Sequence, residues 1–213
     1  MSLKIAVMGA GGIGGYYGGR LAAAGMDVTF IARGAHLAAM QKDGLRIISP
    51  LGDVHIPAVK ATDDPATIGP VDIVMFCVKL YDVDEASELC RPLIGPNTAV
   101  ISFLNGIDSE VRMQAILGAG TVVGGVAQIP SNIRNPGVIE HKAQFAVLEF
   151  GELDSRDSPR LTTFHDACTE AGIQSYLVGN IEAAIWLKFA ILVPFATVCG
   201  LTRLPGKILI EDP

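Results

Sequence analysis

The segment Gly9-Ala10-Gly11-Gly12-Ile13-Gly14 decides the fold that we predict for this chain. It follows the apolar run of residues 3–8, which is typical of a short buried strand, and it leads into residues 16–24, which have the character of a helix. Residues 28–32 form a second apolar run at the distance expected for the next strand. This order of strand, glycine-rich turn, helix and strand is typical of a unit that binds a dinucleotide.

Each glycine of this loop has a physical role in such a unit. Gly9 permits a tight turn, Gly11 lets the backbone approach a pyrophosphate, and Gly14 lets the helix pack closely on the strand. The free N–H groups at the start of the helix favour negative charge. The alternative is a turn that binds nothing, since a chain with 24 glycines contains such patterns by chance. The strands and helix around the loop favour phosphate binding by residues 9–14.

Arg33 indicates which dinucleotide is bound. Units that bind NAD usually carry an acidic residue about 20 residues beyond the loop, where it bonds the ribose 2′-hydroxyl. This chain has Arg33-Gly34 at the end of the second strand and no acid there. A guanidinium can hold a 2′-phosphate with two hydrogen bonds, whereas a carboxylate would repel it. A solvated arginine at a strand end is the alternative. We expect NADP(H).

Composition and charge exclude several other classes. Half of the 213 residues are hydrophobic and 18% are charged, which allows a sizeable core. The formal net charge is −6 and no basic run is present, which argues against a nucleic-acid partner. The four cysteines contain no Cys-x-x-Cys pair and are expected to be reduced core residues, and the four histidines show no ligand spacing, so that we expect no metal.

The chain is expected to be cytoplasmic. The polar Lys4 and the early glycines argue against a signal peptide. The most apolar stretch, residues 189–199, contains Pro194 and is shorter than the roughly 20 residues that a membrane span needs. We therefore expect no membrane partner.

Strands that alternate with helices predict a Rossmann-like, doubly wound, mostly parallel α/β sheet over residues 1–178. Gly179-Asn180 marks a change, after which residues 179–213 are expected to begin an all-helical domain. Ser158-Pro159 is expected to start a helix, with Ser158 as the N-cap. Strands are expected at residues 45–48 and 54–59 as a hairpin, at 71–78, 98–103, 121–127 and 174–177, and at 138–142 and 145–149 as an antiparallel pair; helices are expected at 35–42, 83–93, 109–117 and 159–171.

Two polar residues follow strands of this sheet. Lys79 ends the run 71–78, and Asn105 follows the run 98–103. Because ligands of open parallel sheets lie outside the carboxyl ends of the strands, both residues are expected on the same edge as the glycine loop. A surface lysine and an Asn-Gly turn are the alternatives.

Lys188 lies in a segment that is otherwise apolar, with no carboxylate four residues to either side. Its ammonium either reaches outward to water or is partly desolvated. Desolvation would lower its pKa and make it a usable proton donor near neutral pH. The sequence alone leaves both alternatives open.

The ordered set of these motifs resembles the ketopantoate reductases (2-dehydropantoate 2-reductases). The resemblance rests on residues 9–14, Arg33, Val78-Lys79, Asn105-Gly106, Pro136-Gly137-Val138-Ile139 and Ile181-Glu182-Ala183-Ala184-Ile185-Trp186-Leu187-Lys188, and it covers the whole chain. It implies NADPH-dependent reduction of 2-dehydropantoate to pantoate, in pantothenate and coenzyme A synthesis. It also implies that Lys188 is the general acid, Lys79 a cofactor contact, and Asn105 a residue between nicotinamide and substrate.

The chain departs from this family in two ways. Leu192 and Ala196 stand where the family usually carries asparagines that hold the substrate, which favours a different, less polar 2-oxo acid as an alternative. Family members also continue into a longer helical domain that supplies a glutamate and a serine, so that this chain is expected to lack most of that domain. A nucleotide-binding protein without catalysis is the third alternative. The sequence leaves open whether the chain forms a homodimer.

Overall fold

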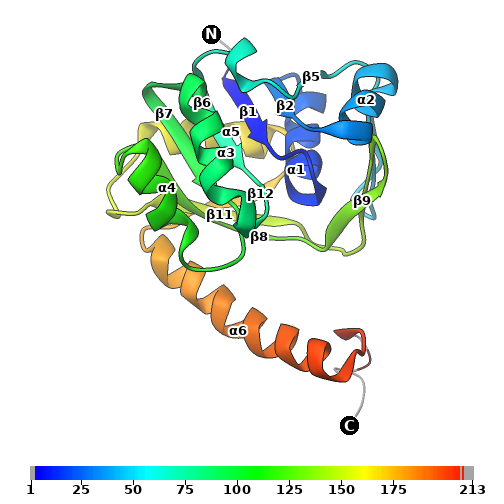
Figure 1. Cartoon of the computed structure of the whole chain (residues 1–213), viewed down its shortest axis with the longest axis vertical. Helices are drawn as coiled ribbons and strands as arrows, with labels where there is room; N and C mark the ends of the chain where they lie inside the picture. The colour runs from blue at the N-terminus through cyan, green and yellow to red at the C-terminus, as the bar shows by residue number, and fades with distance from the viewer. Residues whose placement is uncertain (1–2, 207, 209–213) are drawn as a thin grey trace.

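The computed structural model describes residues 3–206 and 208 of the chain. An eight-stranded sheet forms its centre, in the order β12-β11-β8-β7-β6-β1-β2-β5, and a four-stranded sheet has the order β4-β3-β10-β9 (Figure 1). The strands are β1 (Lys4–Met8), β2 (Asp27–Ile31), β3 (Leu45–Ile48), β4 (Val54–Ile56), β5 (Lys60–Thr62), β6 (Val71–Phe76), β7 (Ile94–Ser102), β8 (Val122–Gln128), β9 (Ser131–Asn135), β10 (Val138–His141), β11 (Val147–Glu152) and β12 (Gln174–Leu177). The helices are α1 (Gly12–Ala23), α2 (Gly34–Asp43), α3 (Val83–Cys90), α4 (Ser109–Leu117), α5 (Pro159–Glu170) and α6 (Ile181–Thr202), with 3-10 turns η1 (Pro65–Thr67), η2 (Leu80–Asp82) and η3 (Arg91–Leu93).

The central strands are apolar on both faces because helices cover both faces of the sheet. In β1, Ile5 and Val7 join the core cluster that contains α1 and α5, whereas Ala6 and Met8 join the cluster that contains α3 and α4. All neighbouring strands of this sheet are parallel except the β8–β11 pair. The doubly wound, mostly parallel fold predicted from the sequence is therefore confirmed.

Helix α1 lies between the two sheets and packs closely on both. A β-carbon on Gly18 would come within 2.7 Å of Val7 in β1, and one on Gly19 would come within 2.7 Å of Ile47 in β3. A side chain at either glycine would therefore force Val7 or Ile47 to shift within the packed core. The glycines of α1 thus allow the small sheet to pack close to strand β1 of the large sheet.

The predicted antiparallel pair of residues 138–142 and 145–149 is wrong. Strand β10 pairs antiparallel with β9 and parallel with β3, so both of its edges are taken. The turn at Gly137, with φ of +76°, closes the β9–β10 hairpin. Strand β11 instead pairs antiparallel with β8 over six residues. Strands β5 and β9 were absent from the sequence prediction.

The predicted helix start at Ser158-Pro159 is confirmed, since α5 begins at Pro159 with Ser158 at its N-cap position, but the Ser158 side chain makes no capping hydrogen bond. Its Oγ donates a hydrogen bond to Glu152, at 2.6 Å, instead of accepting one from the helix. All four cysteines carry free thiols; Cys90 and Cys168 are buried in the core, whereas Cys77 and Cys199 are only partly buried.

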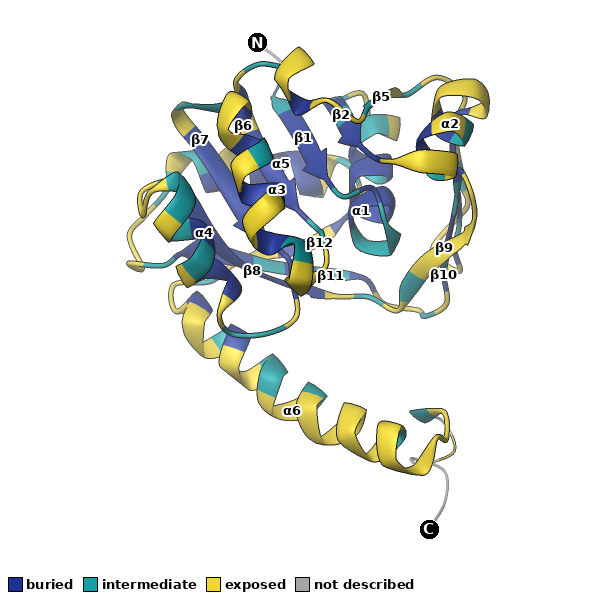
Figure 2. Ribbon diagram, in the orientation of Figure 1, coloured by how far each residue is buried: buried dark blue, intermediate teal, exposed yellow. Residues whose placement is uncertain are grey.

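Helix α6 runs for 22 residues, through Pro194, and is apolar apart from a few residues such as Glu182 and Lys188. Asn180 caps it by accepting a hydrogen bond from the Ala183 N–H at 3.1 Å. Only Ile181 and Ile185 of this helix are buried, and most of its other residues are exposed (Figure 2). By length and composition α6 is able to cross a membrane, although one such helix is weak support for that. The sequence argument considered only residues 189–199 and therefore underestimated the element.

Candidate cofactor and active site

The glycine loop leaves β1 at the carboxyl edge of the sheet. Gly9 has φ of +96°, which side chains rarely adopt, and the N–H groups of Gly9 and Ala10 both donate to the Ile31 carbonyl of β2 at 3.2 Å. These two bonds hold the turn against the neighbouring strand. The turn predicted at Gly9 is confirmed.

Gly11 and Gly14 face different surroundings. A β-carbon on Gly14 would lie 2.3 Å from the Gly9 oxygen and 2.7 Å from Val7, so the close helix–strand contact requires glycine there. A β-carbon on Gly11 would meet no heavy atom within 4 Å. The space over Gly11, at the N-cap of α1, is therefore open to a phosphate-bearing ligand. The loop fits a dinucleotide.

A pocket of about 280 Å³ opens beside this loop. The predicted residues Gly9, Ala10, Gly11, Arg33 and Lys79 line it together. Gly12, Ile13 and Gly14 lie in the first turn of α1 and do not line it. Two cations and an open glycine backbone in one pocket suit a ligand that carries several phosphate groups.

Three carboxylates that the sequence reasoning missed share this pocket: Asp63, Asp82 and Glu85. Glu85 of α3 lies 3.6 Å from the Arg33 guanidinium, and both side chains are about two-thirds exposed, at 68% and 64%. An exposed pair at this distance is weak, so Arg33 remains available to an anionic ligand. No spacing in the sequence pointed to these acids, because separate crossovers of the fold bring them together.

His36 of α2 is a further residue of the pocket that the sequence reasoning did not single out. Its Nε2 lies 2.9 Å from the Ala10 oxygen, and its Nδ1 accepts a hydrogen bond from the Gly137 N–H at 3.1 Å. Burial lowers the pKa of His36, although the hydrogen bond to Ala10 acts in the opposite direction. His36 therefore joins the glycine loop to the β9–β10 turn.

Lys188 is partly desolvated, which decides between the two alternatives left open by the sequence. Its Nζ donates a hydrogen bond to the Ala127 oxygen of β8 at 2.8 Å. Burial lowers its pKa to about 8, and the carboxylate of Glu149 partly offsets this effect. An ammonium with this pKa can donate a proton near neutral pH.

The loops after β1, β6 and β7 leave the same edge of the sheet, because Met8 pairs with Phe76 and Phe76 with Ser102 in parallel register. Lys79 and Asn105 each follow their strand by three residues. Asn105 is exposed, however, and neither it nor Lys188 lines the pocket of Arg33 and Lys79. The structure thus brings together Arg33, Lys79 and the glycine loop, but not Asn105 or Lys188.

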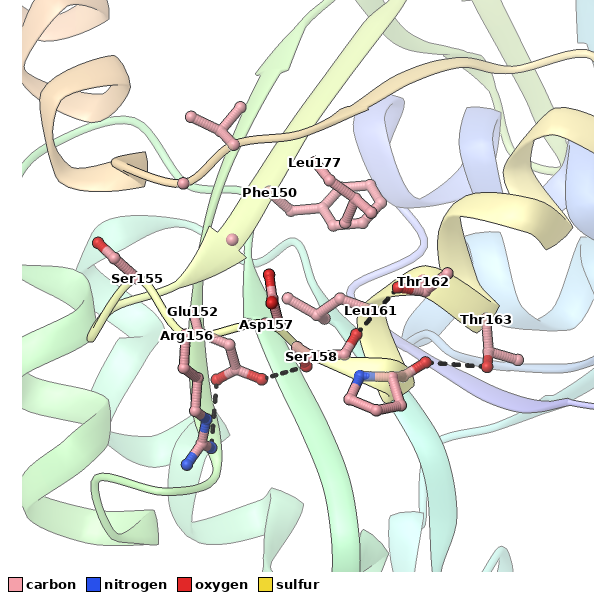
Figure 3. A pocket seen from close by; sticks show the side chains of 14 residues that line it. Phe150, Glu152, Ser155, Arg156, Asp157, Ser158, Leu161, Thr162, Thr163 and Leu177 are labelled. Atoms are coloured by element: carbon pink, nitrogen blue, oxygen red, sulfur yellow. Dashed lines mark hydrogen bonds and ion pairs between the residues drawn. The ribbon is translucent and has the colours of Figure 1, made fainter.

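A larger cavity, of about 600 Å³, lies elsewhere, around the start of α5 (Figure 3). Glu152 is buried there and accepts hydrogen bonds from Ser158 at 2.6 Å and from Arg160 at 2.9 Å. Burial alone would raise the pKa of Glu152, but the bonds from Arg160 and Ser158 outweigh it and hold the pKa below its usual range. Arg160 also donates to the carbonyl of Thr98, within β7, and to that of Gly120, two residues before β8. This network ties strands together on the edge opposite the glycine loop.

Comparison with known proteins identifies the family. The model of the family described as Ketopantoate reductase PanE/ApbA matches residues 5–155, which is most of the chain. The chain belongs to the ketopantoate reductase family. The matched residues contain the glycine loop, Arg33, Lys79 and Asn105.

Individual relatives of this chain agree. It is 32% identical to the uncharacterized oxidoreductase YkpB of Bacillus subtilis and 30% identical to a 2-dehydropantoate 2-reductase of Mesorhizobium japonicum. Both alignments cover 99% of the chain, and 69% and 70% of the respective relatives. A crystal structure of 2-dehydropantoate 2-reductase from Porphyromonas gingivalis W83 matches with a TM-score of 0.90 and 37% identity, over 100% of this chain and 77% of that one. The chain is thus a member of an oxidoreductase family with a Rossmann-like fold.

Proposed function

We propose that the chain is an NADPH-dependent reductase that converts 2-dehydropantoate to pantoate in pantothenate and coenzyme A synthesis. The observation that carries this proposal is the pocket in which the open backbone at Gly11 meets Arg33 and Lys79. The 2-dehydropantoate 2-reductases among its relatives support the choice of substrate.

The cofactor is proposed to be held by residues 9–14, Arg33, Lys79 and Asn105. The backbone N–H groups at the start of α1 would bind the pyrophosphate, and Arg33 would bind the 2′-phosphate. When bound, the nicotinamide supplies the hydride that the 2-keto carbon accepts. The weak pair between Arg33 and Glu85 leaves the guanidinium free to turn toward a phosphate.

Lys188 is proposed as the proton donor and as a substrate contact, together with Asn105. Negative charge builds on the carbonyl oxygen as the keto carbon is reduced, and an ammonium directed at that oxygen stabilises the charge and supplies the proton. One N–H of Lys188 is bound to the Ala127 oxygen, which fixes the direction of the other two. The lowered pKa makes this proton transfer easier than it would be from an exposed lysine.

A second candidate is the reduction of a different 2-oxo acid, and the observation that favours it is the surface next to Lys188. Leu192 lies one helical turn beyond Lys188 and is partly buried, and Ala196 lies one turn further. Both are apolar, so a substrate with a less polar side chain would fit this face better. We further propose that residues 1–178 form the NADP-binding domain and that 179–213 begin the helical one, in a cytoplasmic enzyme.

The test measures NADPH consumption with 2-dehydropantoate, beside a titration of NADPH binding. Turnover with 2-dehydropantoate supports the proposal. Tight binding with turnover only on another 2-oxo acid supports the second candidate. Binding without turnover on any 2-oxo acid would indicate a nucleotide-binding protein without catalysis, and absence of NADPH binding would contradict the proposed cofactor site.

A further inference from the structure

The two hydrogen bonds of His36 define its protonation state. The backbone N–H of Gly137 can only donate, so the Nδ1 that it contacts at 3.1 Å must carry a lone pair. The carbonyl oxygen of Ala10 can only accept, so the Nε2 at 2.9 Å must carry the proton. His36 is therefore neutral in this arrangement, with its proton on Nε2. Adding a proton to Nδ1 would set two donors against each other and break the bond to Gly137.

His36 joins three segments that are far apart in the sequence. It belongs to α2, Ala10 belongs to the glycine loop, and Gly137 belongs to the turn of the β9–β10 hairpin. The hairpin also touches the loop directly, since a β-carbon on Gly12 would lie 2.4 Å from the Ser131 oxygen. Ile133 of the same hairpin lines the pocket. The hairpin is thus one wall of the proposed dinucleotide site.

We propose that His36 is a positioning residue for the dinucleotide, which holds the glycine loop and the β9–β10 hairpin together only while its imidazole is neutral. Protonation releases Gly137, the hairpin that carries Ile133 loosens, and the affinity for the dinucleotide falls. This inference rests on the proposed function, because it concerns the same pocket. It adds a residue that does not need to touch the ligand.

Other charged groups of the pocket bear on this pH dependence. Arg33 lies at the start of α2, Asp63 follows β5, Lys79 follows β6, and Asp82 and Glu85 lie at the start of α3. Burial is the main influence on the imidazole and lowers its pKa. We therefore expect the imidazole to become charged only below its ordinary pKa of 6.5, and its hydrogen bonds to Ala10 and Gly137 to be intact above that pH.

The test is a calorimetric titration of NADP+ between about pH 5.5 and pH 8. It compares the natural chain with His36→Gln, whose side chain does not titrate, and with the control His165→Gln. His165 is also hydrogen-bonded, to Ser175 at 2.8 Å, but in the α5–β12 region. On acidification the natural chain and the control should lose about fivefold more affinity than His36→Gln, as expected for one hydrogen bond. Titration of the 2′-phosphate contributes equally to all three proteins.

Parallel pH profiles in the natural chain and His36→Gln would overturn the inference. Nuclear magnetic resonance of the natural chain without ligand provides the second measurement, which is needed if the variant does not fold. The imidazole should show its proton on Nε2, and the amide resonances of Ala10 and Gly137 should move with the midpoint of the imidazole. Amide resonances of Ala10 and Gly137 that do not shift with the titration of the imidazole, or a proton found on Nδ1, would overturn the inference. Failure of the natural chain to bind NADP+ at about pH 8 would instead contradict the proposed function.

Discussion

Lys188 gives the most direct test of the proposed chemistry. Replacing it by methionine keeps the length and apolar stem of the side chain but removes the proton. General acids of this kind contribute about 10²–10⁴-fold to the rate, which corresponds to about 3–5 kcal/mol of activation free energy. We expect Lys188→Met to lower kcat within this range and to leave NADPH binding within about twofold of the natural chain.

The pH profile makes the test specific. With a pKa of about 8, roughly nine-tenths of Lys188 is protonated at pH 7, and kcat should fall about tenfold for each pH unit well above 8. This alkaline decline should be absent from Lys188→Met. Lys188→Arg keeps the charge but donates its proton poorly, so it should bind the substrate while kcat stays low.

Folding stability serves as the control. Because burial lowers the pKa of Lys188 from 10.5 to about 8, the folded chain binds fewer protons than the unfolded chain between these values, and its stability should rise with pH across this window. Lys188→Met should lack this rise and should be no less stable at pH 7. Lys142→Met, which removes an exposed lysine paired with Glu140 at 3.1 Å, should leave kcat unchanged. A Lys188→Met variant with natural kcat, or with the alkaline decline intact, would refute the assigned role.

Three further predictions concern the loop, the cofactor and the opposite edge of the sheet. Gly14→Ala should lower the free energy of unfolding by about 1–3 kcal/mol, seen as a lower Tm. Gly11→Ala should leave the free energy of unfolding within about 0.5 kcal/mol of the natural chain but weaken NADP+ binding. Equal stabilities of the two variants would contradict the packing at Gly14. Arg33→Gln should weaken NADP+ binding about tenfold and NAD+ binding much less, and an equal loss for both would exclude a 2′-phosphate contact. Glu152→Gln should cost about 2 kcal/mol in denaturant unfolding at pH 7. Because the pKa of Glu152 lies below its usual 4.5, this contribution is complete above that pH and disappears as the pH falls through the lower folded-state value, where variant and natural chain should converge.

The sequence predicted the central sheet well because its signals are local. Buried strands such as β1 and β6 are short apolar runs, and the glycine loop between β1 and α1 combines a turn, a close contact and an open backbone. The small sheet was less predictable. Its strand β10 pairs with β3, about 90 residues earlier in the chain, and no local pattern encodes such a partner.

The candidate site likewise combines residues with a local sequence signal and residues placed by long-range packing. Arg33 and Lys79 were predicted because each follows a parallel strand, and such strands end at one edge of the sheet. His36 and Glu85 reach the pocket through packing between separate elements, so their positions in the sequence carried no signal. The sequence predicted a helical segment after Gly179 but not that a single helix continues through Pro194, because an internal proline usually interrupts a helix.

The small sheet has a consequence for the order in which this chain matures on the ribosome. The pocket has its first wall residue at Met8 and its last at Ile133, so most of the chain must be synthesised before the cavity is closed. The central strands β2, β1 and β6 can pair much earlier than the hairpin that completes the site. The proposed dinucleotide is therefore expected to bind late in folding, and nascent chains that end before Ile133 should bind NADP+ more weakly than the whole chain.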